Sequence, residues 1–242
     1  MRLDGRVALV TGAGRRLGRA LALGLAGRGA RVAVHYNGSE AGARETVGEI
    51  RRGGGEAELF QEDMSRPGAP ERLVAAVADG LGALHVLVNS AAVMQRTPIG
   101  SVTVADWDAM FALNLRAPFF AAQAAAAHMG GGGVIVNIAD LAAFETWPGY
   151  VPHGITKAGV VQMTRALARA LAPAVRVNAV APGAVLLPDE WDQSAAARLQ
   201  GTTPLRRLGS PGDVVQAVLY LIDADYVTGE VLLVDGGRHV RK

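Results

Sequence analysis

The chain has no cysteine among its 242 residues. This absence excludes disulfide bonds, zinc–thiolate sites, iron–sulfur clusters and a cysteine nucleophile, and it suits a reducing compartment. No cluster of His, Asp and Glu has the spacing of metal ligands, so the sequence predicts no metal site. Half of the residues are hydrophobic, which excludes intrinsic disorder and allows a large buried core.

A large charge excess and a long apolar run are missing as well. The 24 basic and 22 acidic residues leave a net charge of +2, which does not indicate a nucleic-acid partner. The longest apolar stretch, near 117–129, is interrupted by Gln123 and is shorter than the roughly 18 residues of a membrane helix. Asp4 and an immediate strand pattern are not typical of a secretory signal. We expect a cytoplasmic protein that binds neither membranes nor nucleic acid.

Short apolar runs alternate with longer helical patterns along the chain. The apolar runs predict strands near 6–11, 31–36, 57–61, 84–89, 134–139 and 175–180. The helical patterns lie near 17–28, 40–52, 71–79, 104–129 and 155–171. Strands that are apolar throughout are typical of parallel sheets covered on both faces. The sequence therefore predicts a single α/β domain over 1–242, a Rossmann-type doubly wound parallel sheet with helices on both faces.

The segment 181–209 shows no regular pattern and ends at a helix start marked by Ser210, Pro211 and Asp213. Parallel sheets bind ligands at the carboxyl ends of their strands, and long loops there often cover the ligand. We expect residues 184–209 to form a substrate lid. An insertion that only packs against the domain is the alternative.

A glycine-rich turn separates the first predicted strand from the first predicted helix. It reads Thr11-Gly12-Ala13-Gly14-Arg15-Arg16-Leu17-Gly18. Glycines let the main chain approach a pyrophosphate, and the helix N-terminus adds N–H donors and a positive dipole end. This position after an N-terminal strand predicts a dinucleotide site, with a plain tight turn as the alternative.

The end of the second predicted strand indicates which dinucleotide binds. An NAD site usually carries Asp or Glu there, to bind the ribose 2′-hydroxyl. Here the chain reads His35-Tyr36-Asn37-Gly38-Ser39, with no carboxylate before Glu40. A 2′-phosphate prefers cations and hydroxyl donors, which are available from Arg15 or Arg16, His35, Asn37 and Ser39. We therefore expect NADP(H). The alternative is that the arginines are solvated surface groups and the cofactor preference is loose.

Further motifs follow along the chain. They are Asp63 after the third strand, Asn89-Ser90-Ala91-Ala92 after the fourth, Asn114 in the long helix, Lys157 within Ile-Thr-Lys-Ala-Gly, Pro182-Gly183, and Asp235-Gly236-Gly237. With the glycine-rich turn, they make essentially the whole chain resemble the short-chain dehydrogenase/reductase family. Within it, the sequence is most similar to the pteridine reductases and dihydromonapterin/dihydrofolate reductases. Arg16 in place of the middle glycine, His35-Tyr36 and the tail Asp-Gly-Gly-Arg-His carry that likeness.

The resemblance implies roles for several positions. Asp63 would contact the adenine, Asn89 would lie in the ribose region, and Pro182-Gly183 would border the nicotinamide. A turn-forming aspartate is the alternative for Asp63. Motifs and resemblance together place these residues against the cofactor: Gly12, Gly14, Arg15, Arg16, Leu17, Gly18, His35, Tyr36, Asn37, Ser39, Asp63, Met64, Asn89, Ala91, Lys157, Pro182 and Gly183. The resemblance also implies a homotetramer or homodimer.

The catalytic positions depart from the family pattern of serine, tyrosine and lysine with an upstream asparagine. Counted back from Lys157, the tyrosine position holds His153 and the serine position holds Asp140. Aspartate at the serine position is shared with the pteridine reductases, whereas histidine at the tyrosine position is not. The usual proton donor is therefore absent.

Reduction of a carbonyl or imine still needs a proton donor, because hydride transfer leaves negative charge on oxygen or nitrogen. A phenol ionises near pH 10 and an imidazole near pH 6.5, so an imidazole needs less tuning to act as an acid. Our hypothesis is that Asp140 orients and charges His153, which donates the proton. Lys157, one helical turn away, would hold the nicotinamide ribose, and Asn114 would fix a water molecule. Tyr150 is a rival donor.

The sequence thus favours an NADPH-dependent reductase of a C=O or C=N bond in a small substrate, with a pteridine-like compound as one candidate. A carbonyl or 3-oxoacyl reductase is one alternative, and a catalytically silent NADP-binding redox sensor is another. Tyr150 and Trp191 are candidate substrate contacts, although a lone aromatic side chain in a loop can equally serve packing. The same ambiguity holds for Phe144 and Trp147, and Arg238 and His239 are either surface charges or site groups.

Overall fold

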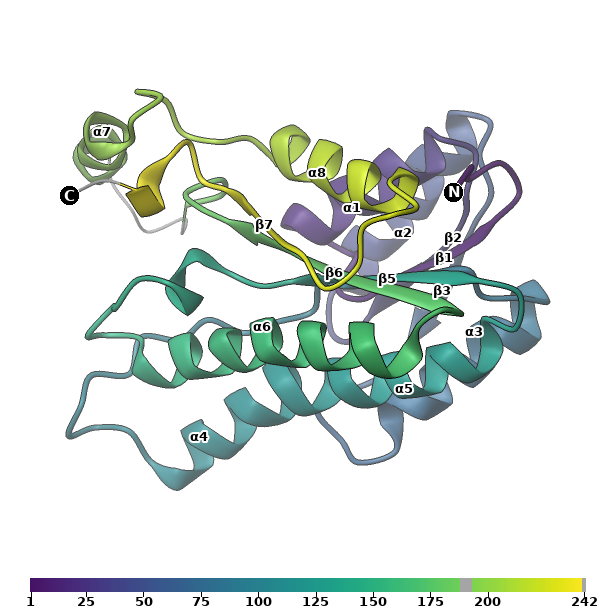
Figure 1. Ribbon diagram of the computed structural model, residues 1–242, viewed down its shortest axis with the longest axis horizontal. Coiled ribbons are helices and arrows are strands. Elements are labelled where there is room, and N and C mark those ends of the chain that lie inside the picture. The colour runs from purple at the N-terminus through teal and green to yellow at the C-terminus, as the bar shows by residue number, and fades with distance from the viewer. Residues whose placement is uncertain (188–192, 241–242) are drawn as a thin grey trace.

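The protein folds around one parallel β-sheet (Figure 1). The structure, a computed structural model, describes residues 1–187 and 193–240. The strands lie in the order β3-β2-β1-β4-β5-β6-β7 and all pair in parallel. Their bounds are β1 Val7–Val10, β2 Arg31–Tyr36, β3 Ala57–Gln61, β4 Val86–Asn89, β5 Gly133–Ile138, β6 Val175–Pro182 and β7 Val231–Val234. The predicted doubly wound fold is confirmed.

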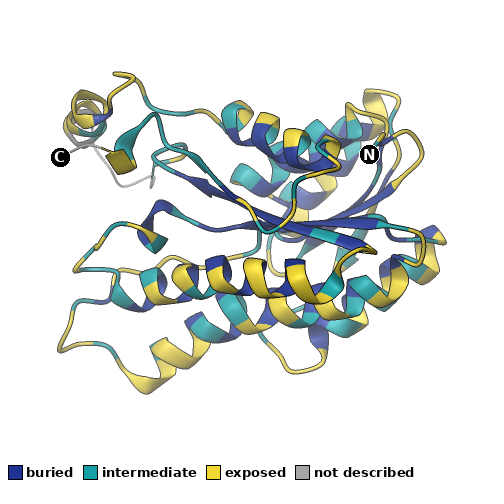
Figure 2. Cartoon of the chain, in the orientation of Figure 1, coloured by how far each residue is buried: buried dark blue, intermediate teal, exposed yellow. Residues whose placement is uncertain are grey.

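Helices cover both faces of the sheet (Figure 1). One layer contains α1 (Arg16–Ala26), α2 (Glu40–Arg52) and α8 (Pro211–Asp223), and the other contains α3 (Ala69–Leu81), α5 (Ala117–His128) and α6 (Val151–Leu171). Figure 2 shows the strands buried between them, with exposed residues on the outer faces of the helices. The apolar strand runs are therefore explained by burial on both faces. Within the described ranges, no helix is long and apolar enough to cross a membrane.

The helical run expected over 104–129 is not a single α-helix. A capping box between Thr103 and Asp106 starts α4 (Val104–Phe111). The next five residues, Ala112–Arg116, form the π-helical turn η1 and lead into α5. Such turns insert an extra residue into a helix and often occur at functional sites. Here the turn contains Asn114.

Three further elements differ from expectation. Helix α6 begins at Val151 rather than near 155, because the fixed φ of Pro152 suits the first helical turn. The segment expected to be irregular contains α7 (Gln193–Thr202), whose alanine-rich sequence favours a helix. Strand β7 was not predicted. It is a short edge strand that pairs with the end of β6.

The carboxyl edge of the sheet has a switch point between β1 and β4. After β1 the chain builds outward to β3, then crosses back to β4 and continues in the opposite direction. Thr11, just after β1, ties the two strand ends together. Its Oγ1 accepts the main-chain N–H groups of Ser90 at 2.9 Å and Ala91 at 3.0 Å. Ligands of open α/β sheets bind in the crevice at such a point.

At the opposite, amino end of the strands, Arg176 on β6 links the sheet to α8. Its guanidinium donates to the carbonyl oxygens of Leu221 (2.8 Å), Ile222 (2.7 Å) and Val227 (3.0 Å), at and beyond the end of α8. We expect Arg176→Met to lower the free energy of unfolding by about 1–3 kcal/mol, because these carbonyls lose their donors. Thermal unfolding should show a loss of several degrees. Arg28→Met, which removes one half-exposed ion pair with Asp223, is the control and should cost less than about 1 kcal/mol. Equal losses in both variants would contradict the argument.

Candidate active site

The glycine-rich turn is built from close main-chain contacts. Gly12 has a φ of +68°, and a Cβ placed there would lie 3.0 Å from Cα of Ala91. A Cβ at Gly18 would lie 2.2 Å from the carbonyl oxygen of Gly12, and one at Gly14 would lie 2.5 Å from Oγ of Ser39. No side chain fits at these positions. The turn thus presents bare main chain and the N-terminus of α1 to the crevice, which fits a pyrophosphate.

Helix α2 supports the turn from behind, and sequence reasoning missed this contact. A Cβ at Gly42 would lie 2.2 Å from the carbonyl oxygen of Gly14. One helical turn later, Oγ1 of Thr46 donates to the carbonyl oxygen of Ala13 at 3.2 Å. A glycine inside an amphipathic helix was the available signal, because glycine disfavours helices and such a position usually has a packing reason.

Two arginines lie where the glycine-rich turn meets α1. Arg15 and Arg16 are both exposed. Arg16 has a φ of +49°, a left-handed conformation that explains why a glycine is common at this position. Its Nη2 donates to the carbonyl oxygens of Leu186 and Leu187, each at 3.0 Å, so the turn is tied to the segment after β6.

The strand end beside these arginines is polar and free of an unpaired carboxylate. Asn37 is exposed and Ser39 is half-buried at the start of α2. Glu40, the first acid after the strand, accepts hydrogen bonds from Nε (2.9 Å) and Nη2 (2.6 Å) of Arg44. This arrangement suits a 2′-phosphate, since the charge of Glu40 is balanced by Arg44.

His35 does not take the position expected for it. Its side chain is buried beneath the glycine-rich turn, where Nδ1 accepts the N–H of Gly12 at 3.0 Å and Nε2 lies 3.0 Å from the carbonyl oxygen of Glu62. Burial lowers the pKa of His35, although Glu62 opposes the effect. Both ring nitrogens are already bonded to main chain, so the imidazole cannot serve as a direct 2′-phosphate ligand. Tyr36, the next residue, is half-buried and packs against the core.

Three other predicted cofactor contacts have their side chains bonded or packed within the protein. Asp63 forms a turn, with Oδ1 accepting from N and Oγ of Ser65, and it pairs with Arg66 at 3.1 Å. The hydrogen bond from Ser65 contributes most to a lowered pKa of Asp63. Met64 is buried in the core, and Nδ2 of Asn89 donates to Oδ1 of Asn137 at 2.9 Å. The predicted cofactor contacts of Met64 and Asn89 therefore stay predictions, and the main-chain atoms of both residues are available for them.

The Asn114 side chain binds the main chain of Val93 through both of its polar atoms. Its Oδ1 accepts the N–H of Val93 at 2.8 Å, and its Nδ2 donates to the carbonyl oxygen of the same residue at 2.8 Å. The π-helical turn therefore fixes the segment after β4 through one amide. The carboxamide is bonded to main chain, and the expected water at Asn114 stays a prediction.

Asp140, His153 and Lys157 meet at the carboxyl end of β5. Asp140 follows the strand, and its Oδ1 accepts the N–H of Ala142, which starts the short helix η2 (Leu141–Ala143). Nε2 of His153 lies 3.6 Å from Oδ2 of Asp140. One turn along α6, Nζ of Lys157 donates to the carbonyl oxygen of Ile138 at 2.9 Å. Burial lowers the pKa of Lys157, and the charge of Asp140 opposes that shift.

Exposure separates the two members of the Asp140–His153 pair. The Asp140 side chain is 25% exposed, whereas that of His153 is 2% exposed. Neither ring nitrogen of His153 has a hydrogen-bond partner among the described residues, although both are buried. A buried imidazole without partners, 3.6 Å from a carboxylate, is a candidate functional group, because such atoms are costly to leave unpaired.

Aromatic and charged side chains border this end of α6. Tyr150 precedes the helix, and its ring meets that of Trp147 edge-to-face at 6.3 Å. Trp147 Nε1 donates to Oε2 of Glu145 at 3.0 Å, and Arg238 Nη2 reaches the same oxygen at 3.4 Å. Arg238 belongs to the C-terminal turn η3 (Arg238–Val240), so the tail borders the site. Phe144 is exposed.

The remaining predicted positions are placed as follows. A Cβ at Gly183 would lie 2.8 Å from Cα of Asp235, so Pro182-Gly183 packs against the tail. His239 pairs with Asp235 at 2.8 Å at the surface. Leu17 packs on the core beside the turn, and Ala91 lies against Gly12. Trp191 lies outside the described residues. Among those residues, no group of three or more His, Asp and Glu could hold a metal ion.

Comparison with known proteins places this geometry in a family. Residues 12–239 match the family model described as enoyl-(acyl carrier protein) reductase. An uncharacterized oxidoreductase of Methylorubrum extorquens is 38% identical, with 98% of each chain covered. A 3-oxoacyl-[acyl-carrier-protein] reductase of Synechocystis is 36% identical, with 97% of each covered.

A solved structure of similar shape carries a dinucleotide. The FolM alternative dihydrofolate reductase 1 of Brucella canis, complexed with NADP, has a TM-score of 0.94 and 31% identity, covering 100% of this chain and 96% of its own. The residues that match the family model include Gly12 to Gly18 of the glycine-rich turn and Lys157 on α6. The chain belongs to the short-chain dehydrogenase/reductase family.

Proposed function

We propose that the protein is an NADPH-dependent reductase that transfers a hydride to a C=O or C=N bond of a small substrate. The observation that carries this proposal is the meeting of Asp140, His153 and Lys157 at the carboxyl end of β5, in the family's catalytic positions. They lie at the edge of the sheet where the glycine-rich turn offers a dinucleotide site.

The proposed cofactor rests on the fit of the turn and its neighbours. The bare main chain of Gly12 and Gly14 would accept the pyrophosphate, and Arg15 with Arg16 would face the 2′-phosphate. The complex of the Brucella canis relative with NADP supports this choice. When bound, NADPH would supply the hydride.

The proton would come from the Asp140–His153 pair. Only Asp140 is open to a substrate, because the His153 side chain is 2% exposed. We therefore place Asp140 Oδ2 against the substrate atom that gains the proton, with Nε2 of His153 behind it as the source of that proton. This reverses the order expected from the sequence, in which His153 meets the substrate. Tyr150, which is half-buried at the start of α6, stays the rival donor.

Lys157 would act as a fixed cation. One N–H of its ammonium group is used by the carbonyl oxygen of Ile138, which leaves two donors for the hydroxyls of a nicotinamide ribose.

The proposed substrate class rests on two relatives and on the aromatic side chains near the Asp140–His153 pair. The dihydrofolate reductase relative supports a flat pteridine-like substrate, and the 3-oxoacyl reductase relative supports a carbonyl substrate. Trp147 and Tyr150 offer aromatic surface beside the pair, which favours a flat ring system. A redox sensor without turnover is the remaining candidate, because the family's tyrosine is replaced by His153.

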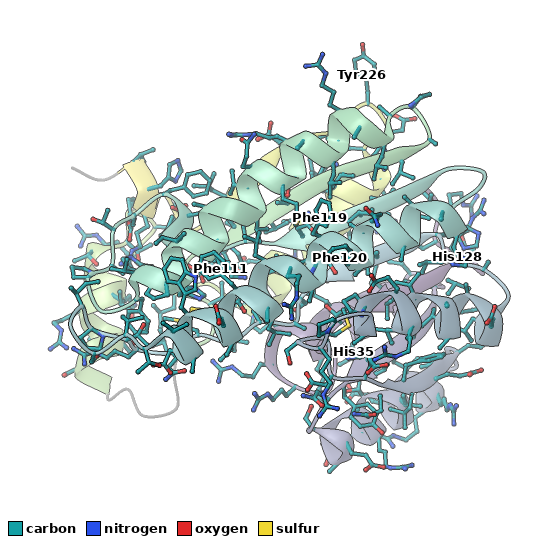
Figure 3. All side chains as sticks on the ribbon, turned by 90° about the horizontal axis from the view of Figure 1, so that it is seen from below. His35, Phe111, Phe119, Phe120, His128 and Tyr226 are labelled. Carbon is teal, nitrogen blue, oxygen red and sulfur yellow. The ribbon has the colours of Figure 1, made fainter. Side chains whose placement is uncertain are left out.

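We also infer that residues 184–209 form a lid, and that the protein is a homodimer or homotetramer. Helix α7 lies beside the C-terminal turn at the site end of the molecule (Figure 1), where Leu205 N–H donates to the carbonyl oxygen of Gly236. Exposed apolar side chains on the outer helices support self-association. They include Trp107 on α4, Phe119 on α5 (Figure 3) and Ile155 on α6.

The test is to follow NADPH oxidation by the purified protein against dihydropteridines, quinones and small carbonyl compounds, with NADH as the comparison. We expect turnover on at least one of these classes, and a preference for NADPH because of Arg15 and Arg16. Tight NADPH binding without turnover on any class would favour the sensor. Equal use of NADH would contradict the proposed 2′-phosphate site.

A further inference from the structure

One imidazole joins the glycine-rich turn, which the proposed function places against NADP(H), to the end of β3. His35, near the end of β2, accepts the N–H of Gly12 on one side and donates to the carbonyl oxygen of Glu62 on the other, each over 3.0 Å. Gly12 belongs to the turn proposed to bind the pyrophosphate, and Glu62 precedes Asp63, which the resemblance predicts at the adenine. The ring is 2% exposed. It therefore fixes the spacing of the two segments from inside the protein.

These partners define the charge state of the ring. A main-chain N–H donates into Nδ1, so Nδ1 carries no proton, and Nε2 must carry one because it faces a carbonyl oxygen. Only the neutral imidazole with its proton on Nε2 satisfies both bonds. A second proton, on Nδ1, would face the N–H of Gly12 with another donor and break that bond.

We propose that His35 is a positioning residue for NADP(H), which holds the glycine-rich turn in its binding shape only while its imidazole is neutral, so that protonation of His35 weakens cofactor binding. This inference rests on the proposed binding of NADP(H). It assigns His35 no contact with the cofactor itself, because both ring nitrogens are already used.

The charged groups around His35 influence whether its imidazole is neutral or protonated. At the end of β3, Glu62 favours the protonated ring, but its carboxylate is paired with Arg72 at 3.1 Å. Asp63 is paired with Arg66, and Glu40 of α2 is paired with Arg44. Arg15 and Arg16 on the turn oppose a further positive charge, and Tyr36 is the titratable neighbour on β2.

Burial outweighs Glu62 and lowers the pKa of His35 below its usual 6.5. The stability that the neutral ring contributes is therefore complete above about pH 6.5 and is lost as the pH falls from there through the lowered pKa. Bound phosphates would act in the opposite sense, by favouring an imidazolium ion. The sign of the pH effect on binding thus distinguishes the broken bond from simple attraction.

The chain contains a matched control at the other end of β1. His85 is half-buried, and its pKa is lowered by burial and then by Arg6. Its Nδ1 accepts the main-chain N–H of Val7, the first residue of β1, at 3.1 Å. It makes the same type of bond as His35, but at the amino end of the strand, away from the crevice.

The experiment measures the Kd of NADPH by fluorescence between pH 8 and pH 5 for the wild-type protein, His35→Asn, His35→Leu and His85→Asn. Asn can place Oδ1 where Nδ1 accepts from Gly12, but it does not titrate. We expect His35→Asn to bind within about threefold of wild type at pH 8, and His35→Leu to bind at least about tenfold more weakly. Comparing proteins at each pH cancels the ionisation of the 2′-phosphate.

The wild-type Kd, divided by that of His35→Asn, should rise at least about threefold from pH 8 to pH 5. His85→Asn should follow the wild type. A constant or falling ratio would overturn the proposal, as would an equal effect of His85→Asn. If no protein binds NADPH at pH 8, the proposed function fails instead. Thermal unfolding of the cofactor-free proteins supplies a second readout, because wild type should lose more stability than His35→Asn below about pH 6.5.

Discussion

Replacing Asp140 by Asn should lower kcat by at least about 100-fold, the range typical of losing a general acid. Asparagine keeps the acceptor that starts η2 through the N–H of Ala142, so the local fold should persist. It removes the carboxyl oxygen that lies 3.6 Å from His153 and is open to the crevice. The Kd of NADPH should stay within about threefold, because Asp140 has no role in the dinucleotide turn. Steady-state kinetics and fluorescence titration measure the two quantities separately.

Two further variants decide between the possible donors. His153→Phe should lower kcat as well, but NADPH binding should survive, since a phenyl ring can fill the buried space of the imidazole. Tyr150→Phe should cost less than about tenfold if the Asp140–His153 pair provides the proton. A loss for Tyr150→Phe as large as that for Asp140→Asn would make Tyr150 the donor. Unchanged turnover in His153→Phe would remove the imidazole from the scheme.

The fold could be predicted from the sequence because its strands are buried on both faces and therefore apolar throughout. The Val-Ile-Val run within β5 and its neighbours required helices on both sides, and the glycine-rich turn after the first strand predicted a dinucleotide site. The break in the long helix was not visible. Residues 112–116 differ from an α-helix only in hydrogen-bond register, and nothing in their composition indicates that register.

For the candidate site, the sequence indicated which chain positions take part, but not how their side chains are oriented or exposed. The strand end His35-Tyr36 was identified, but β2 is buried on both faces, so alternation did not indicate which residue points under the turn. The exposure difference between Asp140 and His153 likewise depends on how η2 folds over the start of α6. Gly42 lay outside every motif, although it touches the turn directly.

Replacing Gly42 by Ala should weaken NADPH binding at least about tenfold, since forcing a methyl group into a packed contact costs about 1–3 kcal/mol. The new Cβ would lie 2.2 Å from the carbonyl oxygen of Gly14. That neighbour is main chain of the dinucleotide turn, so the contact can be relieved only by moving α2 or the turn. The higher helix propensity of alanine would offset less than about 1 kcal/mol. Fluorescence titration and thermal unfolding should both record the loss.

The same helix provides the control for this prediction. Gly48 also lies within α2, but a Cβ there would meet only the end of the flexible Arg52 side chain, at 3.3 Å. Gly48→Ala should therefore raise the free energy of unfolding by about 0.5–1 kcal/mol through helix propensity alone, with no change in NADPH affinity. Opposite signs for two Gly→Ala changes in one helix separate the contact with the turn from any general effect on α2. If both variants stabilise the protein and bind NADPH normally, α2 does not set the shape of the turn.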